Sequence, residues 1–238
     1  MGLLALAISP GIAICLFIYR KDKYNKEPIW MLVLAFGLGM LSIIPAVIIQ
    51  LAYGSDIGRI QSQGTLSLAF FTYCIVAVSE EGSKFLMLRL FLYPRKHFDD
   101  PFDGILYAVM IGMGFATIEN VGYVYEHGVA TGILRMFLSV PAHATFAVLM
   151  GYFIGFAKFR ATNKRLNLFW AIFLPVLFHG TFDFFLFLGS DNLLIIGALV
   201  SFIIALVLSF KAIRRKQALS KLYHEEQDKL FPTEQSSL

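Results

Sequence analysis

Long apolar runs separated by short polar links constrain this chain more than any other feature of its 238 residues. Most of the runs are long enough to span a hydrocarbon core about 30 Å thick, at a helical rise of about 1.5 Å per residue. Hydrophobic residues make up 58% of the sequence, which is more than a water-soluble domain of this size can bury. The sequence therefore predicts an all-α, polytopic transmembrane helical bundle. We expect about seven spans, at approximately residues 3–19, 29–51, 67–92, 103–124, 133–157, 167–188 and 193–213.

Lysine and arginine are concentrated in every second link between these runs. The links at residues 20–28, 95–96 and 158–165 are basic, as is the tail, whereas the other links hold little beyond Arg59 and Arg135. By the positive-inside rule, the N-terminus lies outside and the C-terminus is cytoplasmic. The net charge of +4 thus indicates topology and contact with the anionic lipid bilayer, and we expect no nucleic-acid partner.

The chain is predicted to have a single membrane domain, because no link is long enough for a separate soluble domain. This transmembrane domain covers residues 1–215, and a polar, partly disordered cytoplasmic tail covers residues 216–238. The positive charges follow the first apolar run instead of preceding it, which favours an uncleaved first helix over a signal peptide.

Several ionisable side chains interrupt the apolar runs. They are Glu80, Glu81, Lys84, Glu119, His143, His179 and Asp183. A charge at the bilayer centre costs roughly 2.5–3.5 kcal/mol, so five unpaired charges would together cost up to about 12–18 kcal/mol. That exceeds the net stability of a typical domain, about 5–15 kcal/mol. These groups must therefore meet one another, a metal or water inside the bundle.

The predicted topology places these polar groups in one layer. Counting along the helices puts Glu80 roughly 20 Å, Glu119 about 8 Å and His143 about 15 Å below the outer surface. His179 is at about 13 Å, and Asp183 lies one turn shallower. We therefore expect a membrane-embedded site between the midplane and the outer leaflet.

Small residues near the polar ones indicate the faces on which helices meet. Gly112 leads to Asn120, beside Glu119, at spacings that keep small residues on one face of the helix. Pro141 and Pro175 each precede a histidine, so we expect kinks that open space beside the site.

The paired glutamates suit proton transfer. Glu80 and Glu81 point about 100° apart on a helix, so they cannot play the same part. Lys84 can pair with either of them, which leaves the other free to face water as a general base. The alternative is a structural salt bridge that only locks the helix.

A metal site is a second possibility for the same layer. His179 and Asp183 share a helix face, and together with His143 and Glu119 they form a possible ligand set for zinc with one open position. The alternative for each histidine is a hydrogen bond between helices. The sequence contains no HExxH, which excludes a conventional zincin.

These residues resemble the motifs of the PrsW family of intramembrane proteases. The matching motifs are EExxK (Glu80, Glu81, Lys84), FxxxEN (Phe115, Glu119, Asn120), the isolated His143 and HxxxD (His179, Asp183). The links KDKYNKEP, with Glu27 and Pro28, and HFDDPFDGILYA, with Asp103 and Gly104, match as well, and the resemblance covers about residues 10–190. The family is distantly similar to the type II CAAX prenyl endopeptidases, whose chemistry would also allow a glutamate mechanism without metal.

The resemblance implies site-1 cleavage of a single-pass, membrane-anchored anti-sigma factor under envelope stress, in a bacterial plasma membrane. We expect Glu80 and Glu81 to be catalytic, with Lys84 and Asn120 as structural or charge partners. Glu119, His143, His179 and Asp183 are the predicted ligands of a divalent metal, zinc by preference. The rival functions are a proton- or ion-coupled transporter and a non-catalytic membrane scaffold. No internal repeat supports a transporter, and the intact motifs argue against a scaffold.

Overall fold

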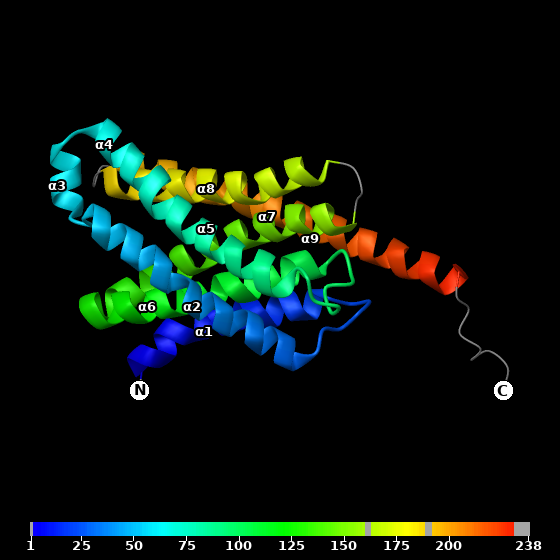
Figure 1. Ribbon diagram of the computed structural model, residues 1–238. Coiled ribbons are helices and arrows are strands. Elements are labelled where there is room, and N and C mark those ends of the chain that lie inside the picture. The colour runs from blue at the N-terminus through cyan, green and yellow to red at the C-terminus, as the bar shows by residue number, and fades with distance from the viewer. Residues whose placement is uncertain (1, 160–162, 189–191, 231–238) are drawn as a thin grey trace.

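The structure, a computed structural model, describes residues 2–159, 163–188 and 192–230. These residues form helices and connecting links, with no strand among them, which confirms the predicted all-α class. In chain order (Figure 1) the elements are α1 (Gly2–Lys21), α2 (Ile29–Tyr53), α3 (Ile57–Ser62), α4 (Thr65–Phe70), η1 (Phe71–Ala77), α5 (Val78–Met87), η2 (Leu88–Leu92), α6 (Asp103–Phe137), α7 (Ser139–Phe159), α8 (Lys164–Leu188) and α9 (Asn192–Leu230).

Five helical stretches of the described chain are long and apolar enough to cross a membrane. They are Gly2–Lys21, Ile29–Tyr53, Asp103–Phe159, Lys164–Leu188 and Ile195–Leu230. The stretch Asp103–Phe159 contains both α6 and α7, so it covers two of the predicted helices. The predicted helix at 67–92 is present as consecutive shorter elements, α4, η1, α5 and η2. The number of crossings and the orientation of the chain stay predictions.

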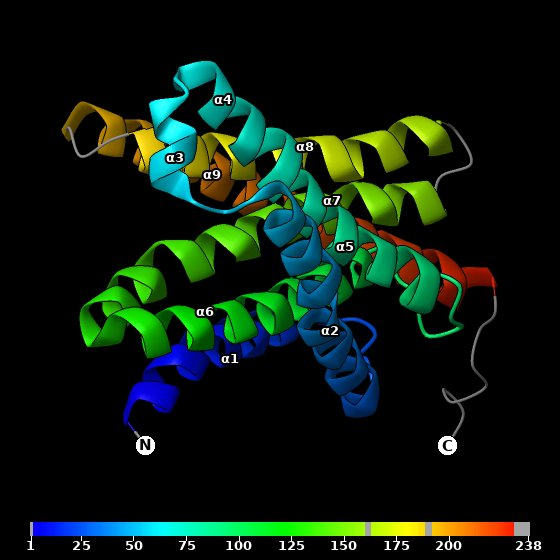
Figure 2. The same ribbon diagram turned by 60° about the vertical axis from the view of Figure 1, so that its left-hand side comes forward.

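Helix α6 forms the centre of the bundle and packs against α1, α2 and α7 (Figure 2). Glycines allow this close packing. A Cβ atom at Gly39 of α2 would lie 2.0 Å from the carbonyl oxygen of Ile111, and one at Gly114 would lie 2.0 Å from that of Phe36. The backbones of α2 and α6 therefore touch directly, as small residues allow in membrane helix pairs.

A π-helical segment lies on each side of α5. Elements η1 and η2 have i→i+5 hydrogen bonding, which is rare and is frequently found at functional sites. Each π segment rotates the residues that follow it relative to a regular α-helix. Between the two segments, Glu80, Glu81 and Lys84 are all buried.

The chain reverses direction within α6, at Gly128. Gly128 has φ +80° and ψ −165°, a backbone conformation that side chains with a Cβ rarely adopt, and residues 129–137 form a further short helical stretch after it. Leu138 then ends this stretch, and α7 begins at Ser139. Pro141 therefore lies in the first turn of α7, where its missing N–H costs no intrahelical bond, instead of kinking a helix that begins near residue 133.

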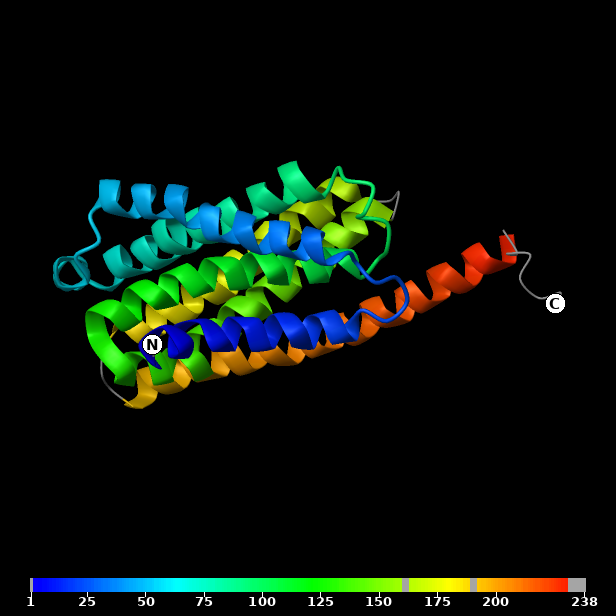
Figure 3. The same cartoon turned by 90° about the horizontal axis from the view of Figure 1, so that it is seen from below.

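Helix α9 continues past the bundle and projects from it (Figure 3). It includes residues 216–230, the first part of the predicted polar tail. Ser220 Oγ donates a hydrogen bond to Asp100 Oδ2 at 2.6 Å, so this part of α9 contacts the link that precedes α6. The rest of the predicted tail, residues 231–238, lies outside the described residues, and the expected disorder there stays a prediction.

Candidate active site

Helix α5 brings three charged side chains into the bundle interior. Glu81 is 1% exposed and Lys84 is 2% exposed. Lys84 Nζ donates a hydrogen bond to Glu81 Oε1 at 2.7 Å and lies 3.5 Å from Glu80 Oε2. The ammonium also lies 4.0 Å from the centre of the Phe115 ring. Lys84 is therefore paired most closely with Glu81.

Glu80 has a different environment from Glu81. Its Oε1 accepts a hydrogen bond from the Gln50 side chain of α2 at 3.2 Å, and its Oε2 lies 3.9 Å from His179 Nε2. Glu80 also borders a cavity of about 580 Å³, whereas Glu81 does not. Of the two acids, Glu80 is thus the one placed to meet water or a substrate.

Helices α6 and α7 supply the next group, centred on His143. His143 Nε2 lies 2.9 Å from Glu119 Oε2, and Lys84 Nζ lies 3.2 Å from His143 Nδ1. Because a lysine ammonium can only donate, Nδ1 accepts and the proton of a neutral ring is on Nε2, directed at Glu119. Glu119 therefore holds the ring in one orientation.

An arginine that the sequence did not single out completes this group. Arg135, from the short stretch after Gly128, lies 2.7 Å from Glu119 Oε2 and donates to Asn120 Oδ1 at 2.9 Å. Asn120 in turn donates to the Ala7 carbonyl of α1 at 2.9 Å. The signal available in the sequence was a single arginine in a link that otherwise lacks basic residues.

His179 of α8 joins the two groups. Its Nδ1 lies 2.9 Å from Glu81 Oε1, and its Nε2 lies 3.2 Å from Asp183 Oδ2. The ring is stacked on Phe146, with centroids 5.2 Å apart, and meets the His143 ring edge-on at the same separation. A carboxylate at each nitrogen fixes the imidazole, and both nitrogens can donate at once only in the protonated ring.

The cavity beside these residues is lined from α2, α3, η1, α5, α6, α7 and α8. Glu80, Glu119, His143, His179 and Asp183 all border it. Its lining also includes residues that are exposed at the end of the bundle, among them Ser55, Glu126 and His127. The polar residues are therefore connected to the exposed end of the bundle and are not sealed in the core.

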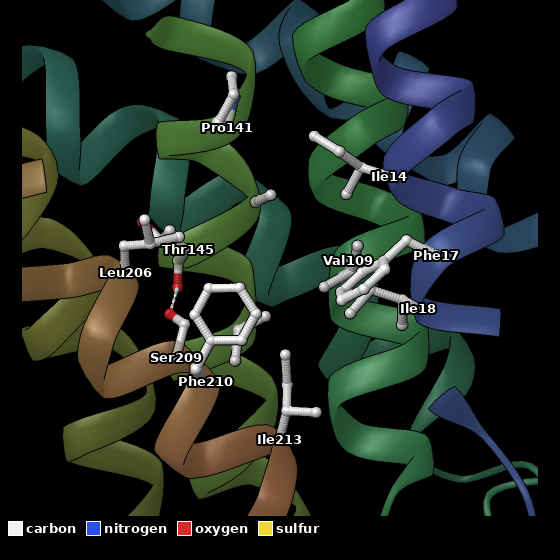
Figure 4. A pocket seen from close by; sticks show the side chains of 12 residues that line it. Ile14, Phe17, Ile18, Val109, Pro141, Thr145, Leu206, Ser209, Phe210 and Ile213 are labelled. Atoms are coloured by element: carbon white, nitrogen blue, oxygen red, sulfur yellow. Dashed lines mark hydrogen bonds between the residues drawn. The ribbon is translucent and has the colours of Figure 1, made fainter. Parts of the chain in front are cut away.

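A second cavity, between α1, α6, α7 and α9, has a different character. Figure 4 shows its largely aliphatic and aromatic lining, in which Ser209 Oγ donates to the Thr145 carbonyl at 3.1 Å. No ionisable side chain is among the described residues that line it. It is therefore a groove for apolar groups and offers no catalytic chemistry.

Four donors in or beside the first cavity could hold a metal ion. Glu80, Glu81, His143 and His179, here called the Glu–His cluster, each offer a ligand atom, and these atoms lie within 4.8 Å of one another. Within the described part of the chain, Oε2 of Glu80 and Oε2 of Glu81 are buried without a hydrogen-bond partner. Buried carboxylate oxygens are normally paired, so these two fit a cation. Two of the predicted ligands are not part of this cluster. Glu119 contacts Nε2 of His143, and Asp183 contacts Nε2 of His179.

The balance of charges at the site also favours a bound cation. In the contact network of the described site residues, Glu80, Glu81, Glu119 and Asp183 face two permanent cations, Lys84 and Arg135. Two negative charges are left in excess in a medium where an unpaired charge is costly. A divalent cation or protonated histidines would neutralise them.

Comparison with known proteins agrees with this chemistry. The model of the PrsW family of intramembrane metalloproteases matches residues 27–215. Protease PrsW of Geobacillus kaustophilus is 35% identical over 185 residues, which cover 78% of this chain and 80% of that protein. The proteases PrsW of Oceanobacillus iheyensis and Bacillus subtilis are 37% and 35% identical, each over 78% of this chain and 83% of their own length. No solved structure matches the chain.

Proposed function

Because this chain belongs to the PrsW family of intramembrane metalloproteases, we propose that the Glu–His cluster is its catalytic centre. The chain is then a membrane-embedded protease of a bacterial membrane, with several apolar helices. The observation that carries the assignment is the meeting of two buried glutamates and two buried histidines beside a cavity that extends to the exposed end of the bundle.

His143, His179 and Glu81 are the proposed metal ligands, and zinc is the proposed metal, because neutral imidazole and carboxylate are donors that zinc accepts. His143 would bind through Nδ1, the nitrogen that accepts from Lys84 in this structure, because its Nε2 is directed at Glu119. When bound, the metal would supply Lewis acidity and a water that ionises near neutral pH. Glu119 and Asp183, proposed as ligands from the sequence, are better placed to orient the two imidazoles. Hydrogen bonds from ligand histidines to carboxylates are the usual arrangement around such metals.

Glu80 is the proposed general base. It takes a proton from the attacking water and returns it to the nitrogen of the leaving amine, which a carboxylate within hydrogen-bond reach can do. Gln50 holds one Glu80 oxygen by a hydrogen bond, and the other, which lies 3.5 Å from Lys84 Nζ and has no hydrogen-bond partner among the described residues, is the one proposed to take the proton. Lys84 holds Glu81 and supplies a positive charge near the oxyanion that forms during attack.

The proposed substrate is a single-pass membrane protein, namely an anti-sigma factor, cleaved at site 1 in the response to envelope stress. A helical substrate has its amides satisfied internally, so a protease needs an extended segment. The cavity includes exposed residues at one end of the bundle, and the positive-inside rule places that end outside. The scissile bond should therefore lie in an unfolded stretch next to the membrane on the extracytoplasmic side.

Mapping the product terminus by mass spectrometry tests this proposal. The purified protease would be incubated in proteoliposomes with a single-pass substrate whose extracytoplasmic juxtamembrane stretch is intact or shortened. We expect cleavage within that stretch and none when it is shortened, while changes in the cytoplasmic part of the substrate have no effect. A cut on the cytoplasmic side would overturn either the topology or the assigned site.

A further inference from the structure

A second group of carboxylates lies at the other end of α6. Asp103 begins this helix, sixteen residues before Glu119 and so roughly 24 Å from it along the helix axis. Glu27, from the link between α1 and α2, and Asp99, from the link before α6, lie beside it. Glu27, Asp99 and Asp103, here called the link cluster, each offer an oxygen within 4.8 Å of the other two. The two links and α9 come together at this end of the bundle in Figure 1.

The link cluster is held by specific contacts. Asp103 Oδ2 accepts hydrogen bonds from the backbone N–H groups of Asp99 and Asp100, at 2.9 and 2.7 Å. Tyr107 donates its hydroxyl to Glu27, and Asn25 Nδ2 donates to Asp99 Oδ1 at 2.7 Å. Each carboxylate is thus fixed in position before any ligand is present.

One oxygen of the cluster is left without a partner. Asp103 is 0% exposed, and its Oδ1 has no hydrogen-bond donor anywhere in the described ranges. Glu27 is 3% exposed, whereas Asp99 is exposed, so the cluster is buried on one side and reaches solvent on the other. A buried carboxylate oxygen without a donor is costly and calls for a cation or a proton.

The nearby lysines bond to backbone carbonyls and form no ion pair with these carboxylates. Lys26 Nζ donates to the Tyr19 carbonyl at 2.5 Å, and Lys158 Nζ donates to the Tyr93 carbonyl at 2.6 Å. Across the described residues, no ion pair reaches the carboxylate of Glu27, Asp99 or Asp103. Among the described residues, the three acids therefore lie together without an ion-pair partner, and Lys158 acts on Asp99 and Asp103 only from beyond ion-pair distance.

We propose that the link cluster binds a hard divalent cation, Mg²⁺ or Ca²⁺, which ties the link between α1 and α2 to the start of α6. Both cations prefer carboxylate and carbonyl oxygens, at about 2.0–2.6 Å from the metal. The His97 carbonyl, which lies 3.3 Å from the Tyr107 hydroxyl, is a further oxygen beside the cluster. The exposed side at Asp99 leaves room for water ligands, and the site needs neither imidazole nor thiolate. This inference does not depend on the proposed function.

Thermal unfolding of the full-length protein in detergent tests the site. After removal of bound cations, Mg²⁺ or Ca²⁺ is added at constant ionic strength. A cation at roughly ten times its Kd should raise Tm by about 3–6 °C. Terbium(III), a luminescent substitute for Ca²⁺, should show emission sensitised by Tyr107. A response to Ca²⁺ alone, to Mg²⁺ alone or to both identifies the cation, and each supports the site.

The variants separate this site from the catalytic centre. The double variant Glu27→Gln/Asp103→Asn should lose the Tm shift and the terbium emission. The single variant Asp99→Asn, at an exposed position, should weaken both and serves if the double variant does not fold. Asp228→Asn, at an exposed position on α9, and His179→Ala, in the Glu–His cluster, should keep both responses.

Three results would overturn the proposal. They are no shift or emission with the unmodified protein, an undiminished response in both link-cluster variants, and a response abolished by His179→Ala alone. The first would mean that Glu27 and Asp103 are neutralised by a proton, and the last would place the cation in the catalytic centre.

Discussion

Glu80 and Glu81 are adjacent in the chain but have different partners. Glu81 bonds to Lys84 and His179, whereas Glu80 is held by Gln50 and borders the cavity. If Glu80 is the general base, Glu80→Gln should lower the cleavage rate by roughly 10²–10⁴-fold with little change in Tm. Glu81→Gln should lower both the cleavage rate and Tm, because the buried Lys84 would lose the carboxylate to which it donates. Rates of cleavage of a membrane-anchored substrate, with thermal unfolding of the same samples, measure the difference.

The opposite pattern would reverse the two roles. If Glu81→Gln kept normal stability and Glu80→Gln unfolded readily, Glu80 would be the structural partner of Lys84. Near-normal cleavage by both variants would remove the glutamates from the mechanism.

Lys84 should contribute mainly to stability. Its Nζ lies 2.7 Å from Glu81 and 3.5 Å from Glu80, and all three side chains are buried. Lys84→Met leaves these acids without a cation, which should cost about 3–5 kcal/mol of unfolding free energy. Lys221→Met is the matched control, because Lys221 pairs with Glu225 on an exposed face, where such pairs contribute about 0–1 kcal/mol. Equal Tm values for the two variants would argue against Lys84 as the partner of the glutamates.

Among the helices, the crossing of α2 and α6 positions α2, which also packs against α5, the helix of Glu80 and Glu81. Gly39→Ala puts a methyl group 2.0 Å from the Ile111 carbonyl oxygen, so the helices must separate, at a cost of about 1–3 kcal/mol or more. Gly37→Ala, two residues earlier, meets nothing within 4 Å and should be neutral or slightly stabilising. Thermal unfolding compares the two, and equal effects would show that the helices do not touch at Gly39.

The helices of this fold could be predicted from the sequence because apolar runs are long and their links are short. The breaks within the helices could not be predicted. Segment η1 packs against α8 and α2, and η2 packs against α6, and such contacts are not encoded in the local sequence. Residues 125–132 read as a link, yet Gly128 reverses the chain and a further helical stretch carries Arg135 back to Glu119. Contact across such a reversal depends on tertiary structure.

The candidate site, too, could be predicted only in part. Spacing and depth alone put Glu80, Glu119, His143 and His179 in one layer, and in the structure they border one cavity. Their pairing could not be predicted, because rotations of a few tens of degrees decide which carboxylate meets which histidine. Gln50 was missed because a single amide in an apolar helix is no sign of a site by itself.

Helix α6 connects the two polar centres of the molecule. The Glu–His cluster lies toward the end where α6 turns back, and the link cluster lies at its start. Helix α6, in backbone contact with α2, can hold the two centres at a fixed separation. Substitutions in the link cluster should therefore lower Tm more than they lower the rate of cleavage.

Metal analysis of the purified, active protein tests the central claim most directly. The account predicts about one zinc per chain in the unmodified protein, since a single set of two imidazoles and one carboxylate holds one ion and leaves a position for water. It predicts loss of both zinc and cleavage in His143→Ala and His179→Ala, with zinc retained in the exposed control His127→Ala. Protein that cleaves its substrate while containing no metal, and that resists strong chelators, would contradict the account.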